Sequence, residues 1–170
     1  MAYSFDFSKR VDYVETDKMG VVHNSIYFWF FEKGRTETMR HLGFSYKEVE
    51  DRGVMMPLVE QYCKYVSPSY YDDLITIRTV IEKLPTARFS FKYSILRKEK
   101  DGRETLLAEG YNVLAFIDSI SRRPMRCPQW ISELLQEKLA DWEFSCMFAN
   151  SKKIFNNLKE RGIYYDYCSY

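Results

Sequence analysis

The chain has 170 residues, of which 46% are apolar and 17% are aromatic, and its net charge at pH 7 is +1. This composition excludes a disordered chain, and the near-neutral charge excludes the basic footprint of a nucleic-acid-binding protein. We expect one globular domain over residues 1–141. The composition shifts beyond about residue 142, so residues 142–170 are expected to form an extension of unknown role.

The cysteine pattern and the hydropathy bear on location. The four cysteines form no C-x-x-C pair, and none has the spacing of metal ligands; they are Cys63, Cys127, Cys146 and Cys168. The first ten residues lack the apolar segment of a signal peptide. No apolar run approaches the roughly 18 residues of a membrane helix. We therefore expect a cytoplasmic protein with no membrane span and no metal site.

The chain opens with a predicted strand, a loop and a helix. Residues 5–13 place most of their apolar side chains on one face, which is typical of a strand. A loop follows, in which Gly20 can adopt an unusual backbone conformation. Asn24 or Ser25 can cap the next helix with a short polar side chain. The helix is expected to run to about residue 42, before Gly43.

The predicted helix changes character along its length. Residues 26–31 are almost all aromatic, and a segment that is apolar on every side must be buried. Residues 33–40 are charged, and we expect them to emerge into solvent. Gly34 is unfavourable in a helix interior by roughly 1 kcal/mol relative to alanine, which indicates close packing of the backbone there.

The pattern then becomes that of long strands. After a short helix over residues 45–52, alternating segments are typical of an antiparallel sheet with short connections; they are residues 55–66, 74–84, 89–97 and 105–117. Pro57 favours an edge or a strand start, and Asp101-Gly102 indicates a hairpin turn. Residues 128–142 have the apolar spacing of a terminal helix. One buried helix and four half-apolar strands predict an α+β fold in which a curved sheet wraps around the helix.

Two carboxylates precede the start of the long helix. Glu15 and Asp17 lie in a turn-like segment, and the helix start offers unpaired N–H groups with a partial positive charge. A carboxylate that faces such donors across a carbonyl-sized space could carry out hydrolysis. A loop carboxylate can equally be a turn former, and Glu15 is expected to be structural. Glu32 is a reserve carboxylate, although pairing with Arg35 at i,i+3 spacing is its simpler role.

A longer motif is similar to that of a known family. The motif is Val11-x-Tyr13-x-Glu15-Thr16-Asp17-x-x-Gly20-Val21-Val22-x-x-x-x-Tyr27-x-x-x-Phe31-Glu32-x-x-Arg35. It resembles the hot-dog-fold acyl-CoA thioesterases of the 4-hydroxybenzoyl-CoA thioesterase type, especially the branch associated with the Tol–Pal system. Tyr65-x-x-Pro68, Asp73 and Asp118-x-x-x-x-Arg123-Pro124-x-x-x-Pro128 extend the resemblance, which covers residues 4–135.

The resemblance implies roles for residues around the helix start. Asp17 is the family's catalytic carboxylate, acting as nucleophile or as general base for a water molecule. Backbone N–H groups of Asn24, Ser25 and Ile26 would polarise the thioester carbonyl. Many members of the branch carry histidine where this chain has Asn24, so His23 stands displaced by one place.

Further residues are expected around the substrate. We assign His23, Tyr27 and Glu60 to the substrate pocket, although His23 can be a cap and Tyr27 a core residue. Arg122 and Arg123, together with Arg88, can meet the phosphates of coenzyme A, or they can be solvated loop residues. No cofactor is expected, because coenzyme A is part of the substrate.

The sequence leaves more than one function open. The first is an acyl-CoA thioesterase, which releases coenzyme A and a carboxylic acid. The alternatives are hydrolysis of acyl-carrier-protein thioesters and a module that binds acyl thioesters or acyl-carrier protein without hydrolysis. The family resemblance implies a homodimer or homotetramer with its active site between subunits.

Overall fold

The computed structural model of the chain describes residues 2–139, and the extension predicted for residues 142–170 lies outside them. The strands are β1 (Tyr3–Arg10), β2 (Val54–Met55), β3 (Leu58–Tyr65), β4 (Leu74–Ile81), β5 (Arg88–Lys98), β6 (Glu104–Ala115) and β7 (Ile117–Asp118). The helices are α1 (Ile26–His41) and α2 (Tyr46–Asp51), the short 3-10 turn η1 (Tyr13–Glu15) precedes α1, and residues 129–139 are also helical.

Five strands form one antiparallel sheet, as predicted. Their order is β1-β4-β5-β6-β3, and β2 pairs separately with β7. Alternate side chains of β4 and β5 are fully buried, among them Ile75, Ile77, Phe89 and Ile95, because successive side chains of a strand point to opposite faces. Pro57 separates β2 from β3, which agrees with the strand start that it predicted.

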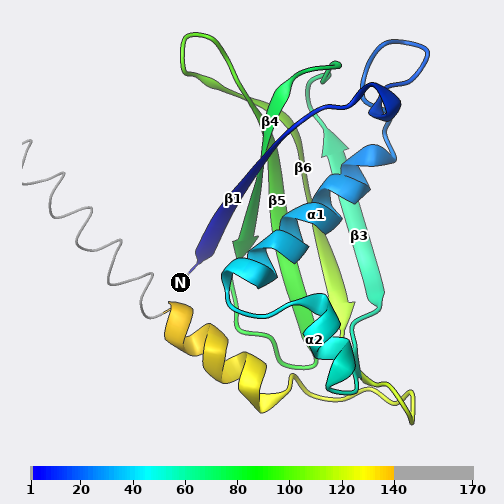
Figure 1. Cartoon of the computed structure of the whole chain (residues 1–170), viewed down its shortest axis with the longest axis vertical. Coiled ribbons are helices and arrows are strands. Elements are labelled where there is room, and N and C mark those ends of the chain that lie inside the picture. The colour runs from blue at the N-terminus through cyan, green and yellow to red at the C-terminus, as the bar shows by residue number, and fades with distance from the viewer. Residues whose placement is uncertain (1, 140–170) are drawn as a thin grey trace, which may run out of the picture.

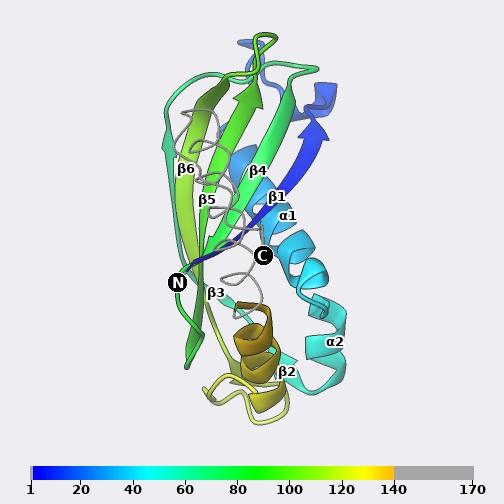
Figure 2. The same cartoon turned by 90° about the vertical axis from the view of Figure 1, so that its left-hand side faces the viewer.

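Helix α1 packs along the inner face of this sheet (Figures 1 and 2). Phe30, Phe31 and Met39 are fully buried, and the Phe31 ring stacks on Tyr93 of β5 with 4.4 Å between ring centroids. Trp29 is 41% exposed, so the aromatic half is not buried on every side. The sheet covers only one side of the helix, and this corrects the sequence-based expectation.

The second half of α1 also differs from the prediction. Gly34, Arg35 and Thr38 are buried, whereas the sequence predicted that residues 33–40 emerge into solvent. The buried face recurs at helical spacing, so it continues through a segment whose composition is charged. Gly34 does mark a close approach, because a Cβ atom there would lie 2.6 Å from Cγ2 of Ile77.

The helix ends are built differently from each other. Gly43, with φ of +101°, follows α1 and occupies the left-handed position expected of a terminating glycine. Ser25 is the N-cap residue of α1, but its side chain makes no capping hydrogen bond. In α2, by contrast, Ser45 Oγ accepts a hydrogen bond from Glu48 N at 3.1 Å.

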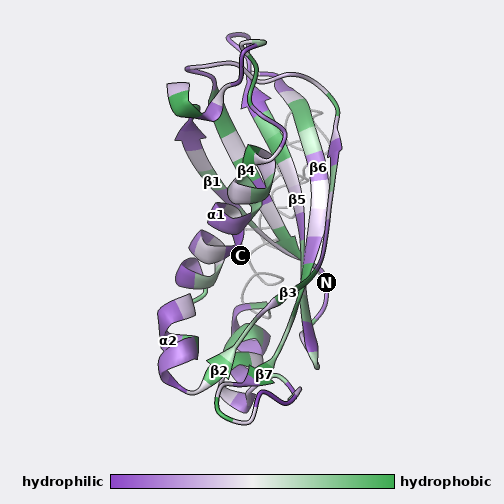
Figure 3. Cartoon of the chain, turned by 90° about the vertical axis from the view of Figure 1, so that its right-hand side faces the viewer, coloured by the Kyte–Doolittle hydropathy of each residue, from purple (hydrophilic) through white to green (hydrophobic). Residues whose placement is uncertain are grey.

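Figure 3 shows that α2 is largely hydrophilic. Among residues 2–139, no helix is long and apolar enough to cross a membrane.

Candidate active site

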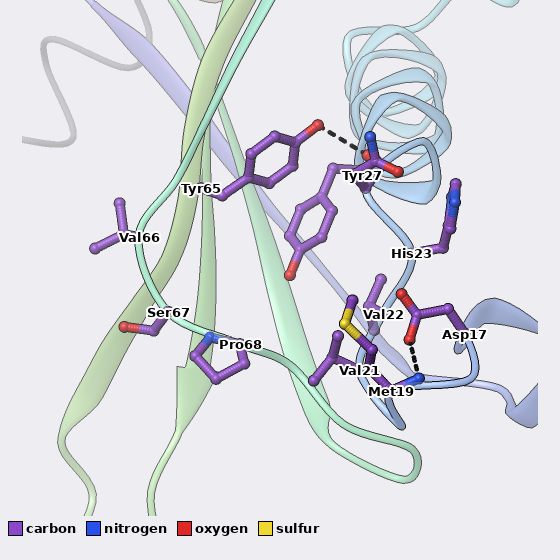
Figure 4. Close-up of a pocket in the computed structure, with 11 residues that line it drawn as sticks. Asp17, Met19, Val21, Val22, His23, Tyr27, Tyr65, Val66, Ser67 and Pro68 are labelled. Atoms are coloured by element: carbon purple, nitrogen blue, oxygen red, sulfur yellow. Dashed lines mark hydrogen bonds between the residues drawn. The ribbon is translucent and has the colours of Figure 1, made fainter.

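A pocket of 450 Å³ lies between the segment that leads into α1 and the end of β3 (Figure 4). It brings together four predicted site residues, Asp17, His23, Asn24 and Tyr27. The remaining lining residues were not predicted as site residues; they are Met19, Val21, Val22, Tyr65, Val66, Ser67 and Pro68. The walls are therefore mainly apolar, and the polar groups are concentrated near Asp17 and the helix start.

Asp17 is held in a tight turn. Its backbone N–H donates to Val21 O at 2.9 Å, and its C=O accepts from Gly20 N at 2.9 Å. Gly20 has φ of +78°, a conformation that a side chain would strain. Oδ1 of Asp17 accepts from Met19 N at 2.8 Å, while Oδ2 has no hydrogen-bond partner within residues 2–139. The turn thus fixes the carboxylate and leaves one oxygen available on the pocket side.

Glu15 makes structural contacts next to this turn and does not line the pocket. It is buried, and its Oε2 accepts from Asp12 N at 2.8 Å. Its Oε1 pairs with Lys9 Nζ at 2.5 Å. The sequence motif places the two carboxylates two residues apart, but only Asp17 reaches the pocket.

Of the three backbone donors predicted at the start of α1, two already have partners within residues 2–139. Ile26 N donates to His23 O at 2.9 Å, and Ser25 N donates to His23 Nδ1 at 3.3 Å. The Asn24 N–H has no partner within the described chain. In a trans peptide the N–H and C=O groups point in opposite directions, so the His23 carbonyl that accepts from Ile26 directs the Asn24 N–H away from the helix.

His23 and Ser25 form a local pair. Nδ1 of His23 lies 2.8 Å from Ser25 Oγ, and this contact replaces the capping bond predicted for Ser25. Both side chains are exposed. The pairing explains why α1 has an N-cap serine without a side-chain cap.

Two tyrosines form the opposite wall. The rings of Tyr27 and Tyr65 meet edge to face at 5.2 Å between centroids, and Tyr65 Oη donates to Asn24 O at 3.0 Å (Figure 4). Burial raises the pKa of Tyr27 to about 12. The Tyr65-x-x-Pro68 pattern was the sequence signal that could have assigned Tyr65 and Pro68 to the pocket.

Asp73 shapes the loop that follows β3. Its Oδ2 accepts from Tyr70 N at 2.8 Å, from Ser69 Oγ at 3.1 Å and from Arg97 Nη1 at 3.1 Å. Ser69 O in turn accepts from Val22 N at 2.8 Å. This network joins the loop to the turn that carries Asp17, so the two sides of the pocket hold each other in place.

Glu60 and Glu32 do not line this pocket. Glu60 Oε1 accepts from Tyr111 Oη at 2.5 Å, because alternation along β3 places residue 60 on the face opposite to that of Tyr65. Glu32 lies 3.6 Å from Arg35, which is the pairing expected from their spacing. Neither carboxylate is brought to Asp17.

The three predicted phosphate contacts also lie elsewhere in the chain. Arg88 lines a separate hollow on the sheet with Lys83 and Lys92. Arg122, whose Nη1 lies 3.0 Å from Met55 Sδ, and Arg123 follow β7. The yellow-green segment after β6 lies at the end of the molecule opposite to the start of α1 (Figure 1). Within one chain, none of the three reaches the pocket. Among residues 2–139, no three metal-binding side chains are grouped as a metal site.

The comparison with protein families decides the assignment of the chain. Residues 11–135 match the model of the thioesterase-like superfamily. The chain belongs to this superfamily. The predictions of a hot-dog fold and of a thioester hydrolase are thereby confirmed.

Individual relatives agree with the superfamily assignment. The chain is 30% identical over 127 residues to the acyl-CoA thioester hydrolase YbgC of Escherichia coli O157:H7, which covers 75% of this chain and 92% of YbgC. A hypothetical protein of Thermus thermophilus superposes with a TM-score of 0.70 at 30% identity, covering 79% of this chain and 96% of that structure.

The predicted type is supported at the level of fold. 4-Hydroxybenzoyl-CoA thioesterase from Pseudomonas sp. strain CBS-3 superposes with a TM-score of 0.69, covering 77% of this chain and 98% of that structure. Its sequence identity is 23%, so this likeness establishes a shared fold and leaves the substrate open.

Proposed function

We propose that this thioesterase-superfamily member hydrolyses acyl-CoA thioesters to coenzyme A and a carboxylic acid. The observation that carries the proposal is that a carboxylate oxygen of Asp17 and the N–H of Asn24 belong to residues lining one pocket and that neither has a hydrogen-bond partner within residues 2–139. The name of YbgC, an acyl-CoA thioester hydrolase, supports coenzyme A as the thiol. The motif residues around Asp17 support the proposed 4-hydroxybenzoyl-CoA thioesterase type and its Tol–Pal-associated branch.

The chemistry needs few groups. A thioester carbonyl is already reactive, so a carboxylate and a preorganised donor suffice, and the proposed reaction uses no cofactor. Asp17 either removes a proton from the attacking water or attacks the carbonyl carbon itself, forming an anhydride that water then hydrolyses. The C–S bond breaks, the thiolate leaves as coenzyme A after protonation, and the Asn24 N–H stabilises the negative charge that develops on the carbonyl oxygen.

We also propose that the working unit is a homodimer or a dimer of dimers. Strand β3 is one of the two outer strands of the sheet, and an unpaired strand edge is a template for another strand. Its apolar side chains Leu58 and Val59 are about half exposed, at 47% and 50%. Pairing along β3 would bring a second copy beside the pocket.

Contacts from Arg88, Arg122 and Arg123 to coenzyme A phosphates stay predictions. A cytoplasmic location also stays a prediction.

The test of the proposed function is release of coenzyme A by wild type and by Asp17→Asn. Across short, long and aryl acyl-CoAs, we expect wild type to turn over at least one substrate and the variant to lose at least about a hundredfold in kcat, because base catalysis contributes about 10²–10⁴. Asp12→Asn is the matched control, since Asp12 precedes the same turn with a side chain that is 68% exposed. It should retain wild-type activity.

Two outcomes would redirect the assignment. Turnover that survives Asp17→Asn would remove Asp17 from the chemistry. Absence of turnover by wild type across the panel would favour the carrier-protein substrates, which can be tested with acyl-carrier-protein thioesters in the same assay. Tight binding of these thioesters without hydrolysis would support the binding module.

A further inference from the structure

We infer that Tyr65 is a positioning residue of the active site, which aligns the backbone of Asn24 for the thioester carbonyl. This inference rests on the proposed function and adds a residue that lies on a different element from the reacting groups. Tyr65 is the last residue of β3, 41 residues from Asn24 in the sequence. Its hydroxyl therefore joins the sheet to the start of α1.

The Asn24 backbone is bounded by two peptide groups. The first, between His23 and Asn24, carries the unused Asn24 N–H, and it is fixed by the hydrogen bond from Ile26 N to His23 O at 2.9 Å. The second, between Asn24 and Ser25, carries the Asn24 carbonyl, which accepts from Tyr65 Oη at 3.0 Å. Since each peptide group is planar, fixing both groups fixes the backbone dihedral angles of Asn24, and the Tyr65 hydrogen bond anchors the turn that carries the Asn24 N–H to the end of β3.

The second peptide group has few other restraints. Its N–H, that of Ser25, donates to His23 Nδ1 at 3.3 Å, a longer contact from an exposed side chain. Within residues 2–139, no other hydrogen bond links β3 to residues 23–26. Loss of the Tyr65 hydroxyl would therefore release residues 23–26 from the sheet, so that this turn and the Asn24 N–H that it carries could shift as a unit.

The Tyr65 hydroxyl is itself held by its ring. The ring meets Tyr27 edge to face at 5.2 Å between centroids, and Tyr27 is buried in the first turn of α1. Aromatic pairs in this geometry are favourable and directional. The hydroxyl is thus presented to the Asn24 carbonyl by a ring that is already anchored on the helix.

Such a residue should affect kcat more than KM. A donor aimed at the carbonyl oxygen is most valuable when negative charge develops in the transition state. Misalignment of the donor therefore slows the chemical step while ground-state binding in the apolar pocket is retained. The loss should be smaller than the hundredfold or more typical of removing a donor completely, because Asn24 keeps its N–H.

The experiment compares Tyr65→Phe with Tyr62→Phe. Tyr62 is on the same strand with the same class of side chain and a similar exposure, 49% against 47% for Tyr65, but its ring stacks on Tyr111 on the other face of the sheet. We expect Tyr65→Phe to lower kcat about tenfold with KM within about twofold, and Tyr62→Phe to leave both unchanged. Both variants should unfold at nearly the wild-type temperature.

A second readout separates this inference from the proposed function. In ¹H–¹⁵N spectra of the ligand-free protein, the amide resonances of Asn24 and Ser25 should shift in Tyr65→Phe and stay in place in Tyr62→Phe. These spectra test the positioning role even if wild type hydrolyses none of the acyl-CoAs, which would overturn the function alone. Unchanged amide resonances, an unchanged kcat, or a raised KM at constant kcat would each overturn the positioning role.

Discussion

At the scale of single residues, the contact between α1 and the sheet depends on the absence of a side chain at Gly34. A Cβ atom there would lie 2.6 Å from Ile77 Cγ2 and 2.7 Å from Thr79 Oγ1, closer than real atoms approach. Both neighbours are fully buried and β-branched, so they have few rotamers with which to yield. The helix can lie at its observed distance from β4 only because residue 34 is glycine.

Gly34→Ala should therefore destabilise the protein. Alanine gains about 1 kcal/mol of helix propensity over glycine, but overpacking of a filled core typically costs about 1–3 kcal/mol. We expect a lower midpoint of urea unfolding, measured by circular dichroism. Thr36→Ala is the control, because the Thr36 hydroxyl bonds only to carbonyls of its own helix, and it should stay within about 0.5 kcal/mol of wild type. A Gly34→Ala variant as stable as wild type would contradict the close packing.

At the scale of elements, helices α1 and α2 both begin with a serine, and this serine has a different partner in each helix. The Ser45 side chain caps α2 by accepting from Glu48 N, whereas the Ser25 side chain bonds to His23 at the start of α1. The same residue type at the same helix position therefore stabilises one helix directly and the other only through a neighbouring side chain. Sequence propensity assigns both serines the same role.

Alanine substitution should distinguish the two caps. Ser45→Ala is expected to lose about 1 kcal/mol of unfolding free energy, as is typical when a capping side chain is removed. Ser25→Ala should lose less than about 0.5 kcal/mol, because an exposed contact outside the helix is replaced by water. Urea titrations of both variants under one set of conditions provide the comparison. Equal losses would mean that Ser25 caps α1 in solution.

At the scale of the whole molecule, buried tyrosines make the free energy of unfolding depend on pH in the alkaline range. Burial raises the pKa of Tyr3 and of Tyr27 from 10.0 to about 12 and also raises the pKa of Tyr93. The folded state keeps these phenols protonated where the unfolded chain releases their protons. Their contribution to stability is therefore complete below pH 10 and is lost as the pH rises from about 10 to about 12.

This linkage predicts a steep alkaline unfolding. Each such tyrosine adds a slope of about −1.4 kcal/mol per pH unit in this range. The unfolding free energy, measured by urea titration between pH 9 and pH 12, should fall less steeply in Tyr27→Phe than in wild type. Identical slopes would show that the Tyr27 hydroxyl ionises as readily in the folded protein as in the unfolded chain.

Assembly through the exposed edge of β3 is the second prediction for the whole molecule. Val59→Lys should shift the sedimentation of the protein toward the monomer, because a lysine at a strand edge opposes pairing with another strand. Val14→Lys is the matched control, since Val14 is 86% exposed but lies in η1, away from β3. A wild-type protein that sediments as a monomer would contradict the proposed dimer.

The local features could be predicted from the sequence because they depend on neighbouring residues. Alternation assigned the buried faces of β4 and β5, glycine marked the end of α1 and the close approach at Gly34, and the motif placed Asp17 before the helix start. Each of these signals is a period, a turn preference or a spacing. Such properties are encoded within a few residues, so they can be recognised in the sequence without knowledge of the fold.

The tertiary structure decided which distant residues meet. Tyr65 joins the pocket from β3, whereas Glu60, five residues earlier, faces the other side of the sheet and bonds to Tyr111. The charged half of α1 is buried on one side because β4 and β5 cover it. Of the three candidate donors, only Asn24 keeps an N–H without a partner in residues 2–139, because His23 accepts from the other two. Strand register and side-chain rotamers determine these contacts, and neither is specified by local sequence alone.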